Sequence, residues 1–208
     1  MLQRVSFPVA GTEVEAILHL PDGETIGGVA VLAGRRHTID SQKDLCGAIA
    51  SAGVAAIRFA HRTDDGLARL ADTAAAIRLL RAHPSVPQRI GVVGHSYGGA
   101  IAALAAGRDS RIRSAVLIVP PAQQPYFGTV KPVPESSRTR AKVLIVSATA
   151  DEVVDPGDSE RYATVLRQAG VVCNVVRIDG ADHMFTQPEQ RTAMQAAVTK
   201  WLRETLAD

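Results

Sequence analysis

Two hydrophobic patterns alternate along this chain of 208 residues. Runs of consecutive apolar residues are typical of strands buried on both faces, and apolar residues at helical spacing predict amphipathic helices. The runs lie at residues 29–33, 54–59, 89–93, 114–119, 143–147 and 171–178, and helical spacing is found at 45–52, 67–80, 100–107, 162–169 and 194–202. This alternation predicts an α/β fold with a mostly parallel central sheet and helices on both faces.

Two segments depart from this rhythm. Residues 5–9 and 13–20 alternate enough between apolar and polar positions to predict an N-terminal antiparallel hairpin at one edge of the sheet. Residues 120–140 contain five prolines and no helical period, so they form either a surface connection or a minimal lid. Their aromatic residues Tyr126 and Phe127 either line a pocket or pin this loop down. No insertion is long enough for a large cap domain, and we expect residues 1–208 to form a single domain.

Composition narrows the classes of function. Hydrophobic residues make up 46% of the chain and charged residues 21%, which is ordinary for a soluble globular protein. A net charge of +2 and an aromatic content of 4% argue against a nucleic-acid partner. The sequence has neither a signal-peptide pattern nor a run of about eighteen apolar residues, so we expect a cytoplasmic protein without a membrane partner.

The sequence offers no pattern for a cofactor. Cys46 and Cys173 each lie in an apolar segment, where a role as small buried hydrophobes is favoured over a disulfide. Potential metal ligands do not show metal-binding spacing, and neither a phosphate loop nor a dinucleotide fingerprint occurs. We therefore expect no metal and no cofactor, and the sequence leaves the oligomeric state open.

The most informative stretch is Gly94-His95-Ser96-Tyr97-Gly98. It lies between the apolar run 89–93 and a run of small residues, which predicts a strand, a sharp turn and a helix. A serine at such a turn has a strained backbone, which neighbours without side-chain bulk permit, and its hydroxyl is aimed out of the sheet. The next backbone N–H then lies at the N-terminus of a helix, where positive partial charge stabilises an anion.

Two polar residues follow later strands of the predicted sheet. Asp151 follows the run 143–147, and His183 follows the run 171–178. Because ligands bind outside the carboxyl ends of parallel strands, we expect both side chains to lie near Ser96. Histidine can take the proton of a serine hydroxyl near neutral pH, and a carboxylate on its far ring nitrogen fixes the tautomer.

Other residues near these positions have competing interpretations. Asp155 is an alternative acid, although the proline that follows it also fits a helix cap. Asp182 precedes His183 directly, and we expect it to be solvent-facing or structural because adjacent side chains on an extended loop point apart. His95 is interpreted as a packing residue, and His19 and His83 as surface residues.

The serine turn and the chain order Ser96, Asp151, His183 give the sequence its resemblance to the α/β-hydrolase superfamily. It is similar to small, cap-less serine esterases, thioesterases and dienelactone-hydrolase-like members over nearly its whole length. The resemblance implies that Ser96 is the nucleophile, His183 the general base and acid, and Asp151 the orienting carboxylate. It also implies an oxyanion hole of two backbone N–H groups, from Tyr97 and from Arg35 or its neighbour in the loop after residue 33.

The function that this resemblance implies is hydrolysis of a carboxylic ester or thioester through an acyl-enzyme. An acyltransferase, a cyclase or a peptidase could use the same triad. A non-catalytic protein that keeps the fold as a small-molecule pocket is a further alternative.

Two basic loops are expected at the catalytic edge, Arg35-Arg36-His37 and His61-Arg62. Guanidinium groups suit carboxylate or phosphate, so one hypothesis is an anionic substrate or an anionic carrier such as coenzyme A. The alternative is that these arginines pair with nearby acids at positions 40, 64 and 65. The candidate substrate-binding residues are Gly34, Arg36, His61, Arg62, Tyr126, Phe127 and Met184.

Overall fold

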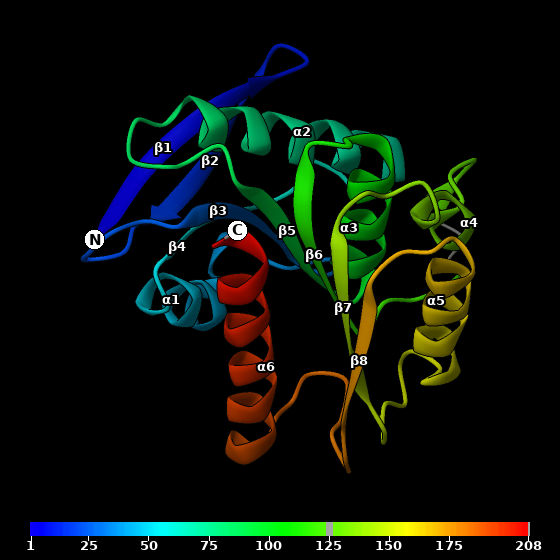
Figure 1. Cartoon of the computed structure of the whole chain (residues 1–208). Helices are drawn as coiled ribbons and strands as arrows, with labels where there is room; N and C mark the ends of the chain where they lie inside the picture. Colours follow the sequence, from blue (N-terminus) through cyan, green and yellow to red (C-terminus); the bar gives the residue numbers. More distant parts are fainter. Residues whose placement is uncertain (124–126, 208) are drawn as a thin grey trace.

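The computed structural model describes residues 1–123 and 127–207, and within them eight strands form one sheet (Figure 1). The strand order is β1-β2-β4-β3-β5-β6-β7-β8. β2 pairs antiparallel with β1 and β4, and the other pairings of this sheet are parallel. The strands are β1 (Leu2–Val9), β2 (Thr12–His19), β3 (Gly27–Leu32), β4 (Val54–Phe59), β5 (Ile90–His95), β6 (Ile112–Ile118), β7 (Lys142–Ala148) and β8 (Cys173–Ile178).

Helices cover both faces of this sheet (Figure 1). One face packs against α1 and α6 through a core that includes Cys46 and Trp201, and the other packs against α2, α3 and α5 through a core that includes Ile101 and Tyr162. The helices are η1 (Ile39–Gln42, a 3-10 helix), α1 (Lys43–Ser51), α2 (Gly66–Ala82), α3 (Tyr97–Arg108), α4 (Pro132–Ser136), α5 (Gly157–Gln168) and α6 (Pro188–Leu206). The predicted α/β fold with its N-terminal hairpin is confirmed, and the described residues contain no large cap.

Several element boundaries differ from the predicted ones, most clearly the starts of the last strand and the last helix. The last strand begins at Cys173 because the residues before it complete the end of α5: Gly170 has a φ of 75° and the Val171 N–H donates to the Leu166 carbonyl at 3.0 Å. The last helix begins at Pro188, well before its apolar face. The residues of its first turns are mostly exposed and therefore polar. Hydrophobic periodicity carries no signal for such a polar start, whereas proline is favoured in the first turn of a helix.

The proline-rich segment 120–140 contains α4, a short helix that the sequence pattern does not predict. Phe127 is buried, and its ring stacks on that of Tyr97 with 5.1 Å between centroids and 12° between planes. Phe127 also borders a cavity of about 510 Å³, so both interpretations of this residue have support. Tyr126 lies outside the described residues, and the role of the segment as a lid stays a prediction.

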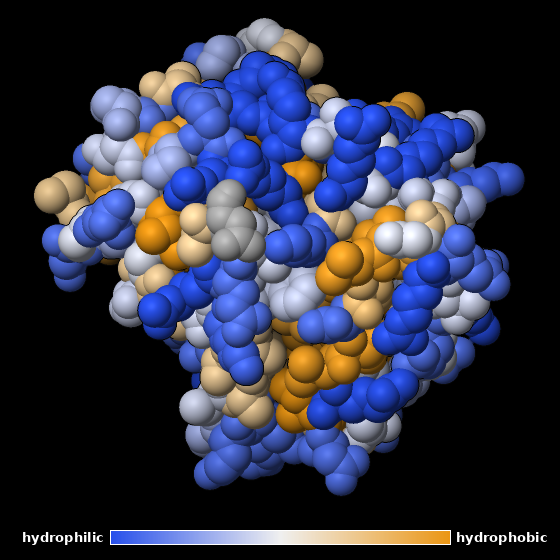
Figure 2. Space-filling view, in the orientation of Figure 1, coloured by the Kyte–Doolittle hydropathy of each residue, from blue (hydrophilic) through white to orange (hydrophobic). Residues whose placement is uncertain are grey.

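Most of the surface seen in the direction of Figure 1 is hydrophilic, and an apolar band lies in the region of β8 (Figure 2). β8 is an edge strand, and Cys173, Val175 and Val176 on it are only partly buried. Most of the predicted site residues lie elsewhere, in the loops at the carboxyl ends of β3, β4, β5, β7 and β8.

The interpretation of His19 as a surface residue is wrong. His19 is 4% exposed, because β2 pairs with β4 and the side chain of Arg58 from β4 reaches back to it. The Arg58 Nε donates to His19 Nε2 at 2.9 Å, while its Nη1 bridges to Ile39 and Asp40 in η1. His83 is partly buried, with Nε2 3.4 Å from the Gln3 Oε1.

This buried pair predicts a pH dependence of stability. Burial, with the charge of Arg58, lowers the pKa of His19 from 6.5 to about 4. Between these values the unfolded chain binds a proton that the folded chain rejects, so His19 makes the protein less stable as pH falls through this window. We expect His19→Gln, which can accept the Arg58 hydrogen bond without titrating, to lose less unfolding free energy than the wild type between about pH 7 and about pH 5. Urea unfolding curves measure this, and equal losses in the two proteins would contradict it.

Candidate active site

Ser96 lies at the turn between β5 and α3 in a backbone conformation rare for a residue with a side chain. Its φ is 55° and its ψ is −126°. A Cβ atom at Gly94 would lie 2.0 Å from the Gly98 carbonyl oxygen, and one at Gly98 would lie 2.2 Å from the Leu32 carbonyl oxygen. Both positions therefore require glycine, and the turn is locked between α3 and the end of β3.

The side chains of Ser96, His183 and Asp151 form a continuous hydrogen-bonded line. His183 Nδ1 is 2.7 Å from Asp151 Oδ2, and His183 Nε2 is 3.0 Å from Ser96 Oγ. An ionised carboxylate can only accept hydrogen bonds, so Nδ1 of a neutral His183 carries the proton and Nε2 accepts from the serine hydroxyl. The three predicted residues are brought together from the ends of β5, β7 and β8.

Further hydrogen bonds fix the positions of Asp151 and His183. The other oxygen of Asp151, Oδ1, accepts from the backbone N–H groups of Val153 and Val154 at 2.8 and 2.9 Å. His95 is buried, and its Nε2 donates to the backbone carbonyl of His183 at 2.8 Å. Burial lowers the pKa of His95 to about 4, so it is neutral near pH 7. His95 is a packing residue as expected, with its ring against those of His183 and Phe185, and in addition it anchors the loop that carries His183.

The two alternative carboxylates have local partners. The exposed Asp155 accepts from the Gly157 N–H at 2.9 Å, at the start of α5. Asp182 accepts from the N–H groups of Met184 and Thr186, within its own loop. Both are arranged as caps of the chain segments that follow them.

The loop after β3 borders the nucleophile. A Cβ atom at Gly34 would lie 3.5 Å from Ser96 Cβ and 3.2 Å from His37 Nε2. Gly34 therefore borders the side chains of both Ser96 and His37. Burial, followed by the charges of Arg69 and His183, lowers the pKa of His37, which favours its neutral form. Sequence reasoning counted His37 only as part of a basic loop and did not place it beside Ser96.

Four of the predicted substrate-binding residues line one cavity of about 220 Å³ beside this loop. They are Gly34, Arg36, His61 and Arg62, and the remaining lining residues are Ala33, His37, Thr63, Asp64 and Arg69. Met184 is 49% exposed and borders a different cavity of about 260 Å³, together with His95 and Phe185.

Most of the positive charge of this cavity is balanced by acids. Arg62 Nε is 2.6 Å from Asp72 Oδ1, and Arg35 Nε, from the same loop as Arg36, is 3.2 Å from Asp64 Oδ2. His61 Nδ1 lies 3.4 Å from Asp72 Oδ2, and burial lowers the pKa of His61. Arg36 is exposed and takes part in no ion pair within the described part of the chain.

Sequence reasoning missed Arg69 and Asp72 in α2, which are 3% and 0% exposed. A signal for them was available. The core-facing positions of α2 recur at helical spacing through Thr73, Ala76, Ile77 and Leu80, and Arg69 and Asp72 continue that row toward the start of the helix. Charged residues at core-facing positions near the carboxyl edge of a sheet indicate buried ion pairs beside a site.

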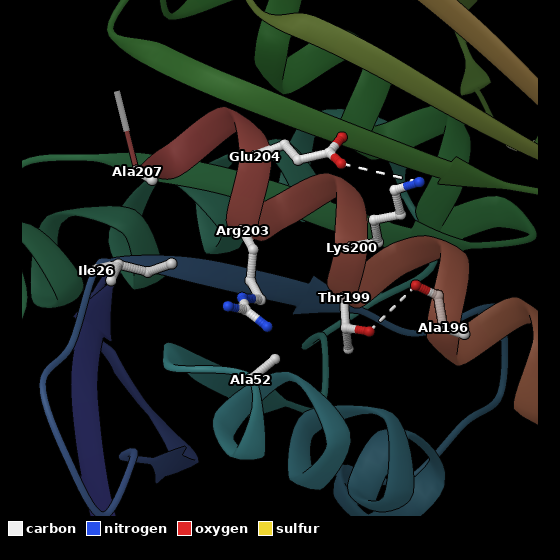
Figure 3. Close-up of a pocket in the computed structure, with 8 residues that line it drawn as sticks. All are labelled: Ile26, Ala52, Ala196, Thr199, Lys200, Arg203, Glu204 and Ala207. Carbon is white, nitrogen blue, oxygen red and sulfur yellow. Dashed lines mark hydrogen bonds and ion pairs between the residues drawn. The ribbon is translucent and has the colours of Figure 1, made fainter.

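A further cavity of about 640 Å³ lies elsewhere, between the end of α1 and α6. Figure 3 shows the side chain of Arg203 pointing into it from α6 toward Ala52 at the end of α1. The described residues include no group of three or more acidic, histidine or cysteine side chains that could hold a metal ion. Nor do they include a helix of the length and apolar character needed to cross a membrane.

Comparisons with known proteins identify the family of the chain and support its fold. The model of the dienelactone hydrolase family matches residues 37–207, whereas no curated protein matches the chain. Among solved structures, DcsB in complex with its substrate analogue has a TM-score of 0.88 at 15% identity and covers 100% of both chains. Est1E from Butyrivibrio proteoclasticus has a TM-score of 0.84 at 17% sequence identity, and the match covers 99% of each chain. A putative dienelactone hydrolase from Klebsiella pneumoniae has a TM-score of 0.85 at 19% sequence identity, and the match covers 98% of each chain. At these identities the structural likeness shows the fold alone.

Proposed function

Because the chain belongs to the dienelactone hydrolase family, within the α/β-hydrolase superfamily, we propose that it is a serine hydrolase acting on a carboxylic ester or thioester. The observation that carries this proposal is the pair of distances at His183, 3.0 Å from Nε2 to Ser96 Oγ and 2.7 Å from Nδ1 to Asp151 Oδ2. A serine, a base and an orienting acid within hydrogen-bond reach are the requirements for nucleophilic catalysis by a hydroxyl.

The proposed reaction uses these contacts. Ser96 Oγ attacks the acyl carbon while its proton passes to His183 Nε2, and Asp151 stabilises the resulting imidazolium. The tetrahedral intermediate collapses as the same proton passes to the leaving oxygen or sulfur, which leaves the acyl group on Ser96. Water then attacks the acyl carbon while one of its protons passes to His183 Nε2. The second tetrahedral intermediate breaks its bond to Ser96 Oγ as His183 returns the proton to that oxygen, and the carboxylic acid leaves.

The proposed oxyanion hole consists of the backbone N–H groups of Tyr97 and Arg35. Tyr97 is the first residue of α3, where the helix dipole adds positive potential, and Arg35 follows Gly34, which borders Ser96. Two donors aimed at a developing oxyanion stabilise the transition state more than the substrate.

Transfer of the acyl group to a nucleophile other than water, as in an acyltransferase, cyclase or peptidase, would use the same triad. Hydrolysis is favoured because Ser96 is partly exposed and the described residues carry no large cap that would exclude water from the acyl-enzyme. A binding protein without catalytic activity has no need of a strained serine aligned with a histidine.

The first prediction concerns the reactivity of Ser96. We expect a fluorophosphonate probe to modify Ser96 stoichiometrically, because the probe traps only an activated serine. Ser96→Ala should abolish labelling, and Asp151→Asn should slow it by up to about 10⁴-fold because the tautomer of His183 is lost. Asp155→Asn is the matched control, since this carboxylate caps α5, and should label at the wild-type rate. Intact mass and peptide mapping measure these rates, and an unlabelled Ser96 in folded wild-type protein would overturn the proposal.

We further propose that the substrate carries an anionic group that Arg36 contacts. This cation lines the cavity beside Gly34, is exposed, and takes part in no ion pair among the described residues, whereas Arg35 and Arg62 are paired with acids. Guanidinium groups bind carboxylates through paired hydrogen bonds.

Arg36→Gln tests this second proposal. We expect the variant to lose about tenfold or more in kcat/KM on a p-nitrophenyl hemisuccinate, and less than about twofold on p-nitrophenyl acetate, because only the first ester has a carboxylate. Lys131→Gln, a change of charge on the exposed N-cap of α4, is the control. Equal losses on the two esters would refute a contact between Arg36 and an anion.

A further inference from the structure

Arg69 reaches from α2 to the loop proposed to supply one oxyanion donor. It is 3% exposed, and its Nη1 donates to the Ala33 carbonyl at 3.1 Å. Both Nη1 and Nη2 lie 3.3 Å from the Gly34 carbonyl oxygen, and Nε donates to the Thr63 carbonyl at 3.1 Å. A single guanidinium thus satisfies consecutive carbonyls at the point where the chain leaves β3.

Asp64 completes this contact and balances its charge. Arg69 Nη2 is 2.6 Å from Asp64 Oδ1, and Arg35 Nε is 3.2 Å from Asp64 Oδ2. Burial acts to raise the pKa of Asp64, but hydrogen bonds and charges from Arg69 and Arg35 outweigh it and hold the pKa below its usual value. The carboxylate therefore stays ionised near pH 7, and its two oxygens link Arg69 to Arg35 in the loop after β3.

The same pair contacts the other proposed donor residue. The Arg69 guanidinium carbon lies 4.8 Å from the centroid of the Tyr97 ring, and the Tyr97 hydroxyl donates to the Asp64 carbonyl at 3.0 Å. Burial raises the pKa of Tyr97 to about 12, so this hydroxyl keeps its proton. Arg69 and Asp64 are therefore in contact with both residues, Tyr97 and Arg35, whose backbone N–H groups we assign to the oxyanion hole.

We propose that Arg69 is a positioning residue that sets the direction of the Arg35 N–H toward the oxyanion, an inference that rests on the proposed serine-hydrolase function. The Gly34 carbonyl and the Arg35 N–H belong to one peptide, and no cis peptide occurs among the described residues. In a trans peptide the C=O and the N–H point in opposite directions. Because the Gly34 carbonyl accepts from Arg69, the Arg35 N–H of the same peptide points away from Arg69, and Gly34 itself borders Ser96.

Glycine at position 34 makes such a restraint necessary. Glycine has access to more backbone conformations than other residues, so the peptide that follows it can rotate unless it is held. The left-handed φ of 55° at Arg36 shows that the loop turns sharply directly after this peptide. Hydrogen bonds to the Ala33 and Gly34 carbonyls fix it without placing a side chain between the loop and Ser96.

Arg69→Met tests the proposal, since it keeps an unbranched apolar stem at this position and removes the guanidinium donors. We expect kcat for p-nitrophenyl acetate to fall about 10²- to 10³-fold, as for the loss of an oxyanion donor, while KM changes less than about threefold. Arg69→Lys, which keeps the charge and some of the donors, should recover part of this loss. The control is Arg81→Met in the last turn of the same helix, whose arginine is paired with Asp109 at 2.8 Å, and its kcat should stay within about threefold of the wild type.

A second readout separates positioning from general damage. The proton shared by His183 Nδ1 and Asp151 should give the same low-field NMR resonance in Arg69→Met as in the wild type, because the triad itself does not contact Arg69. If Arg69→Met fails to fold, Asp64→Asn is used instead, with an expected loss in kcat of about tenfold. A fall in kcat no larger than that of Arg81→Met, or loss of the low-field resonance, would overturn the proposal. An unreactive Ser96 in the wild type would instead overturn the proposed function itself.

Discussion

The site depends on the close approach of two backbones at the turn after β5. The carbonyl oxygen of Gly98 occupies the space that a side chain at Gly94 would need, and the Leu32 carbonyl oxygen does the same at Gly98. This contact forces Ser96 into its left-handed conformation and presses the first turn of α3 against the end of β3. Nucleophile, helix N-terminus and the loop after β3 are therefore fixed by one steric constraint, and the sheet supplies the rigid base that holds it.

Three carboxylates and their partners fix the other loops at the catalytic edge of the sheet. Asp151 is paired with His183, Asp64 with Arg69, and Asp72 with Arg62. Taking a charged group such as a carboxylate out of water is unfavourable, so these contacts are weak evidence for stability and are tolerated where hydrogen bonds satisfy each group. Here each pair holds a loop that follows a strand, which indicates that their role is to fix geometry. The strain at Ser96 is maintained by the same well-packed surroundings.

Much of this arrangement could be predicted from the sequence, for identifiable reasons. Apolar runs and helical periods report burial, so they revealed the strand and helix order, and strand order along the chain predicted that Ser96, Asp151 and His183 would meet. Apolar runs and helical periods do not predict the positions of side chains that are fixed by contacts between elements distant in the sequence. His19 is buried because β2 pairs with β4 and Arg58 reaches it from β4. Arg69 in α2 hydrogen-bonds to the Ala33 and Gly34 carbonyls, which are distant in the sequence. The short helix α4 was missed because proline-rich sequence shows no helical period.

The most direct test of the account is to trap the acyl-enzyme. Protein mixed with excess p-nitrophenyl acetate and quenched with acid during turnover should contain an acetyl group on the peptide that carries Ser96, as measured by mass spectrometry. We expect this adduct in the wild type, a burst of p-nitrophenol equal to the enzyme concentration when deacylation is slow, and neither of them in Ser96→Ala. Turnover that continues in Ser96→Ala at the wild-type rate, with no acetylated serine in either protein, would contradict it.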